Sequence, residues 1–198
     1  MTLMQQLPDI RVDILRMPQD IDNWNLVVKF LRLRKEIFVD EMSWPLFHAD
    51  AMEFEQYDSL SSVYVIAHNR GQVLGGARLV RTDKTQSSGK VIYTYMIRDA
   101  YLGNLPGLPS DLCTQKPPID RNTWELTRFT SAKNQYVGKA ILDRTNEFLK
   151  SKNAKRCLFL GPPSFMRMAR SMGYAPKPLG KIVGNRDGRF LAFGCDVV

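Results

Sequence analysis

Apolar residues recur with the period of an amphipathic helix from about Ile21 to Met42. Asp20 or Asp22 stands just before this run, and aspartate is a residue type that caps helices. We therefore predict one long helix in this region. Its buried face is expected to carry Leu26, Phe30, Leu33, Ile37 and Phe38.

Shorter β-branched and aromatic runs predict strands elsewhere in the chain. The stretch SVYVIAHNRGQVLGGARLVRT, residues 62–82, holds two such runs around a turn at Asn69–Gly71 and predicts a hairpin. The other predicted strands are residues 11–15, a short strand in KVIYTYMI (90–97), TWELTRFT (123–130), KRCLFLG (155–161) and a closing hairpin in 180–197 about Asn185–Gly188.

Two more helices are predicted, over Val137–Ser151 and over residues 163–173, where Gly173 ends the second. Residues 102–121 contain four prolines and two glycines and are predicted as an irregular loop. The element order is strand, helix, hairpin strands, then strand–helix–strand–helix–strand. This order predicts a single α/β domain over residues 1–198, an α/β/α sandwich with a mixed sheet and helices on both faces.

The composition is that of an ordinary globular protein, with 44% hydrophobic and 24% charged residues. No apolar run approaches the roughly 20 residues that a membrane span needs, and the first residues lack the basic-then-apolar order of a signal peptide. The three cysteines are far apart, which argues against a disulfide framework or a zinc site. We therefore expect a cytoplasmic protein with no membrane partner.

The net charge of +8 is unevenly distributed. Seven acids and no Lys or Arg lie between Glu36 and Asp58, whereas ten Lys or Arg and one acid lie between Lys150 and Arg189. Two solvated faces would explain this pattern. The sharper interpretation is an acidic pocket for a cationic ligand and a basic surface for a phosphate or an acidic protein.

Two opposite charges, Glu125 and Arg128, lie inside the apolar strand WELTRF. A lone buried charge is costly, so each should have a partner. A regular strand places residues three apart on opposite faces, whereas a β-bulge, a feature that tends to occur near active sites, places both on one side. We predict an ion pair between them, lining one cleft.

Further charged and aromatic residues can join this pair. Arg34 and Phe38 are four apart and share a helix face, and Trp44 follows the helix. Either aromatic residue alone would be ordinary core.

Two acids and one more arginine extend the set. In MEFEQYD, a turn is needed to bring Glu55 and Asp58 together, and Arg78 lies in the second hairpin strand. Three arginines and three acids would neutralise one another if they were buried together.

The order and spacing of these residues resemble the acyl-homoserine-lactone synthase family, the autoinducer synthases of bacterial quorum sensing. The family has an Arg, a Phe four later and a Trp six after that, matched by RKEIFVDEMSW. It has two acids three apart, a strand Arg, and a Glu three before an Arg, matched by EFEQYD, GARLVRT and WELTRF. FMRMARSMGYAPKPLG resembles the family's later helix and loop. The matched positions are Arg34, Phe38, Trp44, Glu55, Asp58, Arg78, Glu125 and Arg128.

The chain departs from the family pattern at three positions. Glu55 stands where the family usually has Asp, and Tyr95 or Met96 where it usually has Phe. Family members that contact 3-oxo acyl chains have a Thr where a count without gaps places Leu160, which favours an unsubstituted acyl chain here.

The resemblance implies a fold similar to that of the N-acetyltransferases (GNAT fold) and a two-step reaction. The amino group of S-adenosylmethionine attacks an acyl thioester, carried by acyl carrier protein or by CoA, and forms an amide. The methionine carboxylate then closes the lactone and releases methylthioadenosine. S-adenosylmethionine is thus a substrate, and no permanently bound cofactor is expected.

The resemblance also implies roles for the site residues. A base must take a proton from the substrate ammonium, and Glu125 is the first choice and Glu55 the second. Arg34 suits the substrate carboxylate, and Phe38 and Trp44 suit an adenine or a sulfonium. The predicted catalytic residues are Glu125, Glu55, Arg128 and Asp58, and the predicted substrate-binding residues are Arg34, Phe38, Trp44, Arg78, Thr127 and Leu160.

A second motif, QYVGKA, fits the Q-x-x-G-x-A pattern with which N-acetyltransferases bind a pyrophosphate at a helix start. Gln135 and Gly138 are its predicted phosphate-binding residues. A CoA-dependent N-acyltransferase of the GNAT type acting on another amine is therefore the alternative function, although it would not require Arg34, Phe38 and Trp44.

The basic C-terminal half predicts docking of an acyl carrier protein, or it is only a solvated surface. Nucleic-acid binding is disfavoured because no recognition motif is present. A metal site made by the acid pair and His48 is also disfavoured, because no ligand spacing supports it.

Overall fold

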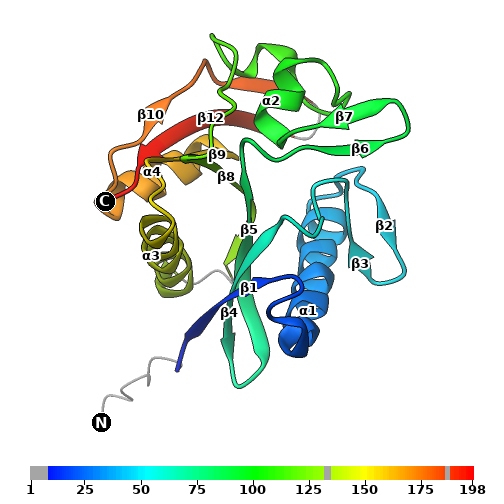
Figure 1. Ribbon diagram of the computed structural model, residues 1–198, viewed down its shortest axis with the longest axis vertical. Helices are drawn as coiled ribbons and strands as arrows, with labels where there is room; N and C mark the ends of the chain where they lie inside the picture. Colours follow the sequence, from blue (N-terminus) through cyan, green and yellow to red (C-terminus); the bar gives the residue numbers. More distant parts are fainter. Residues whose placement is uncertain (1–8, 132–134, 186–187) are drawn as a thin grey trace.

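The computed structural model describes residues 9–131, 135–185 and 188–198. One large sheet dominates, with its main strands in the order β1-β4-β5-β8-β9-β12-β10 and with β11 paired to β12 (Figure 1). Its neighbouring strands are antiparallel except for β8 and β9, which are parallel, so the predicted mixed sheet is confirmed. The strands are β1 (Arg11–Arg16), β4 (Val63–Asn69), β5 (Gln72–Arg81), β8 (Thr123–Ser131), β9 (Arg156–Gly161), β10 (Lys177–Pro178), β11 (Val183–Asn185) and β12 (Gly188–Asp196).

Two short hairpins lie outside the large sheet. They pair β2 (His48–Ala49) with β3 (Met52–Glu53), and β6 (Gln86–Ser88) with β7 (Val91–Tyr93). Only β7 lies in a segment predicted as a strand, 90–97, and the end of that segment instead begins helix α2.

The helices are α1 (Trp24–Arg34), α2 (Met96–Tyr101), α3 (Gln135–Ser151), α4 (Pro163–Ser171), 3-10 turns at Ile21–Asn23 and Ser110–Leu112, and a π-helical segment at Lys35–Glu41.

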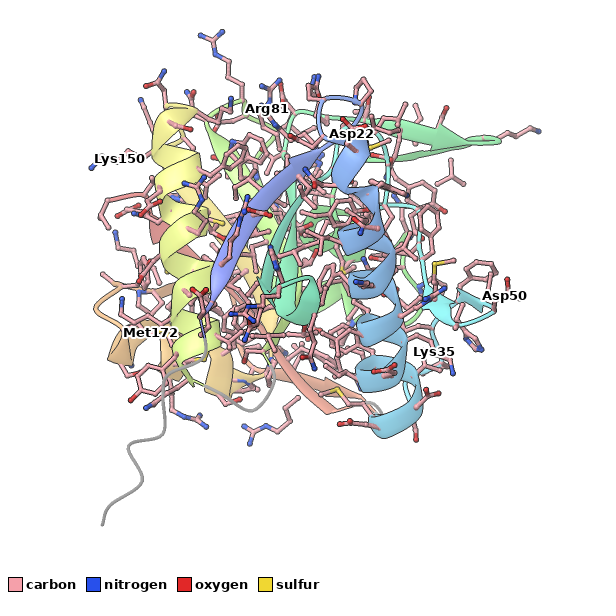
Figure 2. The ribbon with its side chains drawn as sticks, turned by 90° about the horizontal axis from the view of Figure 1, so that it is seen from below. Asp22, Lys35, Asp50, Arg81, Lys150 and Met172 are labelled. Carbon is pink, nitrogen blue, oxygen red and sulfur yellow. The ribbon has the colours of Figure 1, made fainter. Side chains whose placement is uncertain are left out.

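Helices cover both faces of the sheet. Helix α1 and helix α3 lie on opposite sides of β1, β4 and β5, and the view from below shows the sheet between them (Figures 1 and 2). Strand β4 explains this arrangement, because its side chains alternate between the two faces. Val63 and Val65 pack in the cluster with α3, whereas Tyr64 and Ile66 pack in the cluster with α1.

The predicted long helix is confirmed as a continuous helical segment from Ile21 to Glu41. Its predicted aspartate cap is wrong, because neither N-terminal boundary carries a side-chain cap and the Asp20 carboxylate instead accepts a hydrogen bond from Arg16 N at 2.9 Å. The predicted hairpin turn is also confirmed. Arg70 and Gly71 both have positive φ, 46° and 82°, the pattern of a tight hairpin turn.

Strand β8 contains the predicted β-bulge. Thr127 pairs with Arg78 and Thr130 with Gly76, so two residues of β8 face only Ala77 in β5. Arg128, the first of these two, has φ of +54°. The bulge turns Arg128 towards the face on which Glu125 and Thr127 lie.

A fork opens between β8 and β9 just before this bulge. Their parallel pairing runs only from Thr123↔Arg156 to Leu126↔Phe159, while β9 stays paired with β12 as far as Gly161. Backbone groups of β8 beyond Leu126 therefore face the fork rather than a β9 partner. Within the described residues, none of the helices is long and apolar enough to cross a membrane.

Candidate active site

Arg34, the last residue of α1, lies at the centre of a buried ionic cluster. Its Nη1 and Nη2 donate to the two oxygens of Asp58 at 2.8 and 2.9 Å, and its Nε and Nη2 face Glu53. The Arg34 side chain has no exposed surface. The π-helical segment begins one residue later, and such segments often mark functional sites.

Two strand arginines complete the basic half of this cluster. Arg78 Nη2 donates to Glu55 at 2.6 Å and to Thr127 Oγ1 at 3.0 Å, and Arg78 Nη1 lies 3.1 Å from Asp58. Arg128 donates to Glu55 at 2.7 Å and to Glu53 at 3.1 Å. The carboxylates of Glu53, Glu55 and Asp58 are therefore each bound by two arginines.

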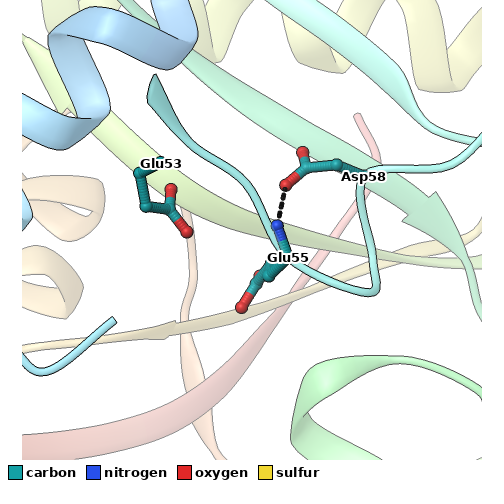
Figure 3. Close-up of side chains that lie close together, drawn as sticks. All are labelled: Glu53, Glu55 and Asp58. Carbon is teal, nitrogen blue, oxygen red and sulfur yellow. Dashed lines mark hydrogen bonds between the residues drawn. The ribbon is translucent and has the colours of Figure 1, made fainter. Parts of the chain in front are cut away.

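The acid loop, which we define as residues 53–58, supplies these three carboxylates (Figure 3). The predicted turn is confirmed: Asp58 N donates to Glu55 O at 2.9 Å, and Glu55 N donates to the Asp58 carboxylate at 3.0 Å. The three carboxylates lie close enough to hold a cation. The guanidinium groups already occupy their oxygens, so arginine rather than a metal ion neutralises them.

The cluster sets the ionisation of its acids. Burial alone would raise the pKa of Glu55, but the charges of Arg128 and Arg78 outweigh it and hold that pKa below its ordinary value. Burial also opposes ionisation of Asp58, yet Arg78 and Arg34 hold its pKa far below the usual range. Both groups are therefore carboxylates at neutral pH.

Glu125 does not form the predicted ion pair with Arg128. Its two oxygens instead accept hydrogen bonds from Met96 N at 3.1 Å and Ile97 N at 2.7 Å, in the first turn of α2. Burial raises the pKa of Glu125 to about 7, although these two hydrogen bonds limit the rise. The prediction failed because the sequence does not reveal that the first amides of α2 lie against Glu125.

An aromatic wall adjoins the arginine cluster. Phe38 and Trp44 stack with ring centroids 5.3 Å apart and planes 9° apart, and Trp44 also contacts Phe190 of β12. The Arg128 guanidinium lies 5.7 Å from the Phe38 ring. Trp44 is only partly buried, so the wall keeps an accessible face beside the cluster.

The other predicted site residues lie on β8, β9 and α3. Thr127 is buried and bonded to Arg78, and Leu160 packs with the cluster that covers the α2 side of the sheet. Gln135 is exposed in the first turn of α3, and Gly138 is buried there, where an added Cβ would lie 3.5 Å from the Phe129 ring. That distance is an ordinary van der Waals contact, so packing of α3 on β8 does not itself require a glycine at this position.

Sequence reasoning missed two buried acids of the site. Glu53 has no exposed surface and binds two arginines, but only a hairpin as short as β2–β3 turns it inward. Asp99 in α2 is equally buried and accepts a hydrogen bond from Tyr57 at 2.8 Å. An acid within a short apolar stretch was the available signal for both.

The buried set holds more carboxyl groups than guanidinium groups. Its three arginines pair with Glu53, Glu55 and Asp58, and two further buried carboxyl groups, those of Asp99 and Glu125, accept hydrogen bonds from neutral donors. An interior rich in carboxyl groups beside the partly exposed ring of Trp44 suits an organic cation.

Solved structures with a similar fold include acyl-homoserine-lactone synthases and a putative N-acetyltransferase. A putative N-acetyltransferase from Lactobacillus plantarum matches with a TM-score of 0.57 at 11% identity, covering 96% of this chain and 99% of its own. The synthase LasI matches with a TM-score of 0.79 at 18% identity, covering 97% and 92%. The synthase BjaI, solved with SAM and isopentyl-CoA, matches with a TM-score of 0.74 at 20% identity, covering 96% and 84%. The predicted GNAT-like fold is thus confirmed.

The sequence defines the family within this fold. The autoinducer synthase family model matches residues 20–161. The acyl-homoserine-lactone synthase of Acinetobacter nosocomialis is 26% identical over 162 residues, which are 75% of this chain and 80% of that protein. The corresponding synthase of Ralstonia solanacearum is 26% identical over 185 residues, 86% of this chain and 80% of that protein. The chain belongs to the autoinducer synthase family.

Proposed function

We propose that the chain is an acyl-homoserine-lactone synthase that joins S-adenosylmethionine to an acyl thioester. The observation that carries this proposal is the buried excess of carboxyl groups over guanidinium groups beside the stack of Phe38 and Trp44. S-adenosylmethionine brings a sulfonium and an ammonium, and both favour such surroundings. Both substrates bind only for the reaction, so neither is a resident cofactor.

The first step is acyl transfer. The substrate ammonium loses a proton, its nitrogen bonds to the thioester carbonyl carbon, and the carbon–sulfur bond breaks to leave a thiol. In the second step a carboxylate oxygen of the same molecule bonds to its γ-carbon, and the bond from that carbon to the sulfonium breaks. The products are the acylated lactone and neutral methylthioadenosine.

Glu125 is the group that we assign as the base for the first step. A base works best when its pKa lies near the working pH, and Glu125 meets this condition whereas Glu55 is held too acidic. The two backbone donors use one lone pair on each Glu125 oxygen, so each oxygen keeps another. Because Glu125 has no exposed surface, we assign its reach to the substrate to an intervening water.

The substrate carboxylate needs a guanidinium with an accessible face. The family resemblance suggests Arg34 for this role, but all three donor nitrogens of Arg34 face carboxylates and none is exposed. Arg128 keeps 8% of its side chain exposed, and its Nη1 contacts the Met96 sulfur at 4.0 Å, which is a weak acceptor. We therefore assign the carboxylate to Arg128, and Arg34 and Asp58 to support of the acid loop.

The acyl group is assigned to the fork between β8 and β9. Backbone N–H groups of β8 beyond Leu126 supply donors for the developing oxyanion. Leu160 of β9 lies on the side of the sheet that α2 covers. The motif at Gln135 and Gly138 is assigned to the phosphate of the acyl donor.

An acyl carrier protein is our choice of acyl donor. Exposed cations lie over the C-terminal half, and a surface this wide exceeds what a small cofactor needs. They are Lys150, Lys152, Lys155, Arg156, Arg167, Arg170, Lys177, Lys181 and Arg189. The test offers one acyl group on carrier protein and on CoA at low and moderate salt. A preference for carrier protein that weakens with salt supports this choice; a salt-independent preference for acyl-CoA contradicts it.

We place the reaction in the cytoplasm, where both substrates are made and where the three buried free thiols, Cys113, Cys157 and Cys195, stay reduced. The function is tested by mass spectrometry of lipids extracted from the medium of cells that express the chain. A homoserine lactone that is absent from cells expressing Glu125→Gln supports it and identifies the acyl group. Equal lactone from both cultures contradicts the assignment of Glu125, and none from either contradicts the function.

A further inference from the structure

Helix α2 is fixed over the ionic cluster by two buried carboxylates. Glu125, from β8, binds the amides of Met96 and Ile97. Asp99, within α2 itself, binds Thr94, two residues before the helix begins: its two oxygens accept hydrogen bonds from Thr94 N and Thr94 Oγ1, both at 2.8 Å. Hydrogen bonds thus hold the first turn of α2 at Met96 and Ile97 and again at Asp99.

Tyr57 joins this turn to the acid loop. Its hydroxyl donates to Asp99 at 2.8 Å, and its ring lies 5.5 Å from the Arg78 guanidinium. Tyr57 stands between Glu55 and Asp58 in the chain and has no exposed surface. Tyr57 therefore connects α2 with both Arg78 and the acid loop.

Burying a carboxylate among neutral donors costs free energy, because those donors only partly replace hydration. Asp99 is fully buried and its three hydrogen bonds come from Thr94 and Tyr57, which are neutral. A well-packed apolar side chain would hold a six-residue helix without that cost.

We propose that Asp99 is a positioning residue which, with Tyr57 and Thr94, holds the amides of Met96 and Ile97 on the carboxylate of Glu125. This inference rests on the proposed function, in which Glu125 is the base. Asp99 acts only through α2 and touches no reacting atom.

The consequence is electrostatic. Backbone donors favour the ionised form of Glu125, so their displacement raises its pKa. Removal of the Tyr57 hydroxyl leaves the charges of the other groups that act on Glu125 unchanged. They are Arg78 of β5, Glu55 and Tyr57 of the acid loop, Tyr95 before α2, Cys113 and Cys157.

The test compares Tyr57→Phe and Asp99→Asn with the wild type over a pH series. We expect the acid limb of the kcat/KM profile to move to a pH higher by about half a unit or more. The loss of activity relative to the wild type should disappear at high pH, where Glu125 is ionised even without the two backbone hydrogen bonds. A merely structural defect lowers the activity of folded protein equally at every pH. An acid limb at the wild-type position in Tyr57→Phe, which keeps the ring and its packing, overturns the inference.

Two matched variants control for general effects. Tyr93→Phe removes the hydroxyl of the ring that packs edge-on against Tyr57, and Asp83→Asn removes a carboxylate paired with Arg81 near the surface. Both are expected to keep the wild-type acid limb. A shift in either control as large as that in Tyr57→Phe also overturns the inference.

A second measurement needs no turnover and separates the positioning role of Asp99 from the proposed reaction. Carbon-13 NMR of protein labelled at the glutamate carboxyl carbons follows the titration of Glu125, assigned by its loss in Glu125→Gln. We expect a higher pKa for Glu125 in Tyr57→Phe than in the wild type. An unchanged pKa overturns the positioning role even if lactone is made, and a raised pKa supports that role even if the proposed reaction fails.

Discussion

Arg34 and Asp58 form a two-point ion pair without exposed surface, in which two guanidinium nitrogens each donate to one carboxylate oxygen. The same carboxylate also accepts from Tyr64 Oη at 2.9 Å and lies beside Arg78. One aspartate thus ties α1, β4, β5 and the acid loop together.

Removal of this carboxylate should destabilise the fold. Asp58→Asn leaves Arg34 and Arg78 short of a negative partner, and breaking a buried pair in this way costs about 3–5 kcal/mol. We expect a loss of this order in the free energy of unfolding, measured with urea at pH 7. Asp83→Asn, which breaks the more exposed pair with Arg81, should cost less than about 1 kcal/mol. Equal losses would contradict the role of Asp58.

The effect of Asp58 should also depend on pH. Its folded-state pKa is lowered, so its stabilisation is present above the unfolded-state pKa of about 4 and is lost as pH falls further. The stability difference between wild type and Asp58→Asn should therefore shrink below about pH 4. A difference that stays constant down to the lowest pH at which the wild type remains folded is the contrary result.

Glu125 should behave in the opposite sense. Its folded-state pKa is raised to about 7. The stabilisation that protonated Glu125 gives the fold is therefore fully present below its unfolded-state pKa and is lost as pH rises through 7. Glu125→Gln, which stays neutral, should therefore gain stability relative to wild type between about pH 4.5 and 7. The exposed Glu147→Gln should show no such trend, and a flat difference for Glu125→Gln would show that its carboxyl ionises normally.

The stack of Phe38 and Trp44 should matter most for the cationic substrate. Trp44→Ala removes the accessible ring, so the KM for S-adenosylmethionine should rise more than that for the acyl donor, by roughly fivefold or more, because a cation–aromatic contact contributes about 1 kcal/mol or more. Trp24→Ala removes a ring that packs on Tyr64 in the α1 core and serves as the control. Equal increases for both substrates would assign Trp44 to the core.

Leu160 should influence the choice of acyl chain. Leu160→Thr introduces a hydroxyl on the side of the sheet that carries the site, so 3-oxo acyl donors should gain relative to unsubstituted donors. The ratio of kcat/KM for the two donors reports this change and is insensitive to the fraction of active protein. An unchanged ratio would place the acyl chain away from Leu160.

The sequence predicted the features that follow from local chemistry. Two β-branched runs around a turn in residues 62–82 predicted the hairpin. The two charges in WELTRF required partners and a bulge, and both are present at Arg128. The partners themselves were predicted wrongly, because the choice between them depends on where α2 lies. That helix has six residues, too few to show a helical period.

Other misses have the same physical origin. Glu53 faces inward because a hairpin of two residues a side turns the chain there, and such short pairing carries no periodic signal. The family pattern pointed to Glu55 and Asp58 but gave no indication that Glu53 completes the cluster with Arg34 and Arg128.

The account is tested most directly by the products of the purified protein. The protein is incubated with an acyl thioester and with S-adenosylmethionine labelled with carbon-13 in its carboxyl group, and the products are analysed by mass spectrometry. We predict a homoserine lactone that carries the label in its ring carbonyl, with methylthioadenosine formed in equal amount. Thiol release without labelled lactone, or acylation of another amine with S-adenosylmethionine left intact, would contradict the account.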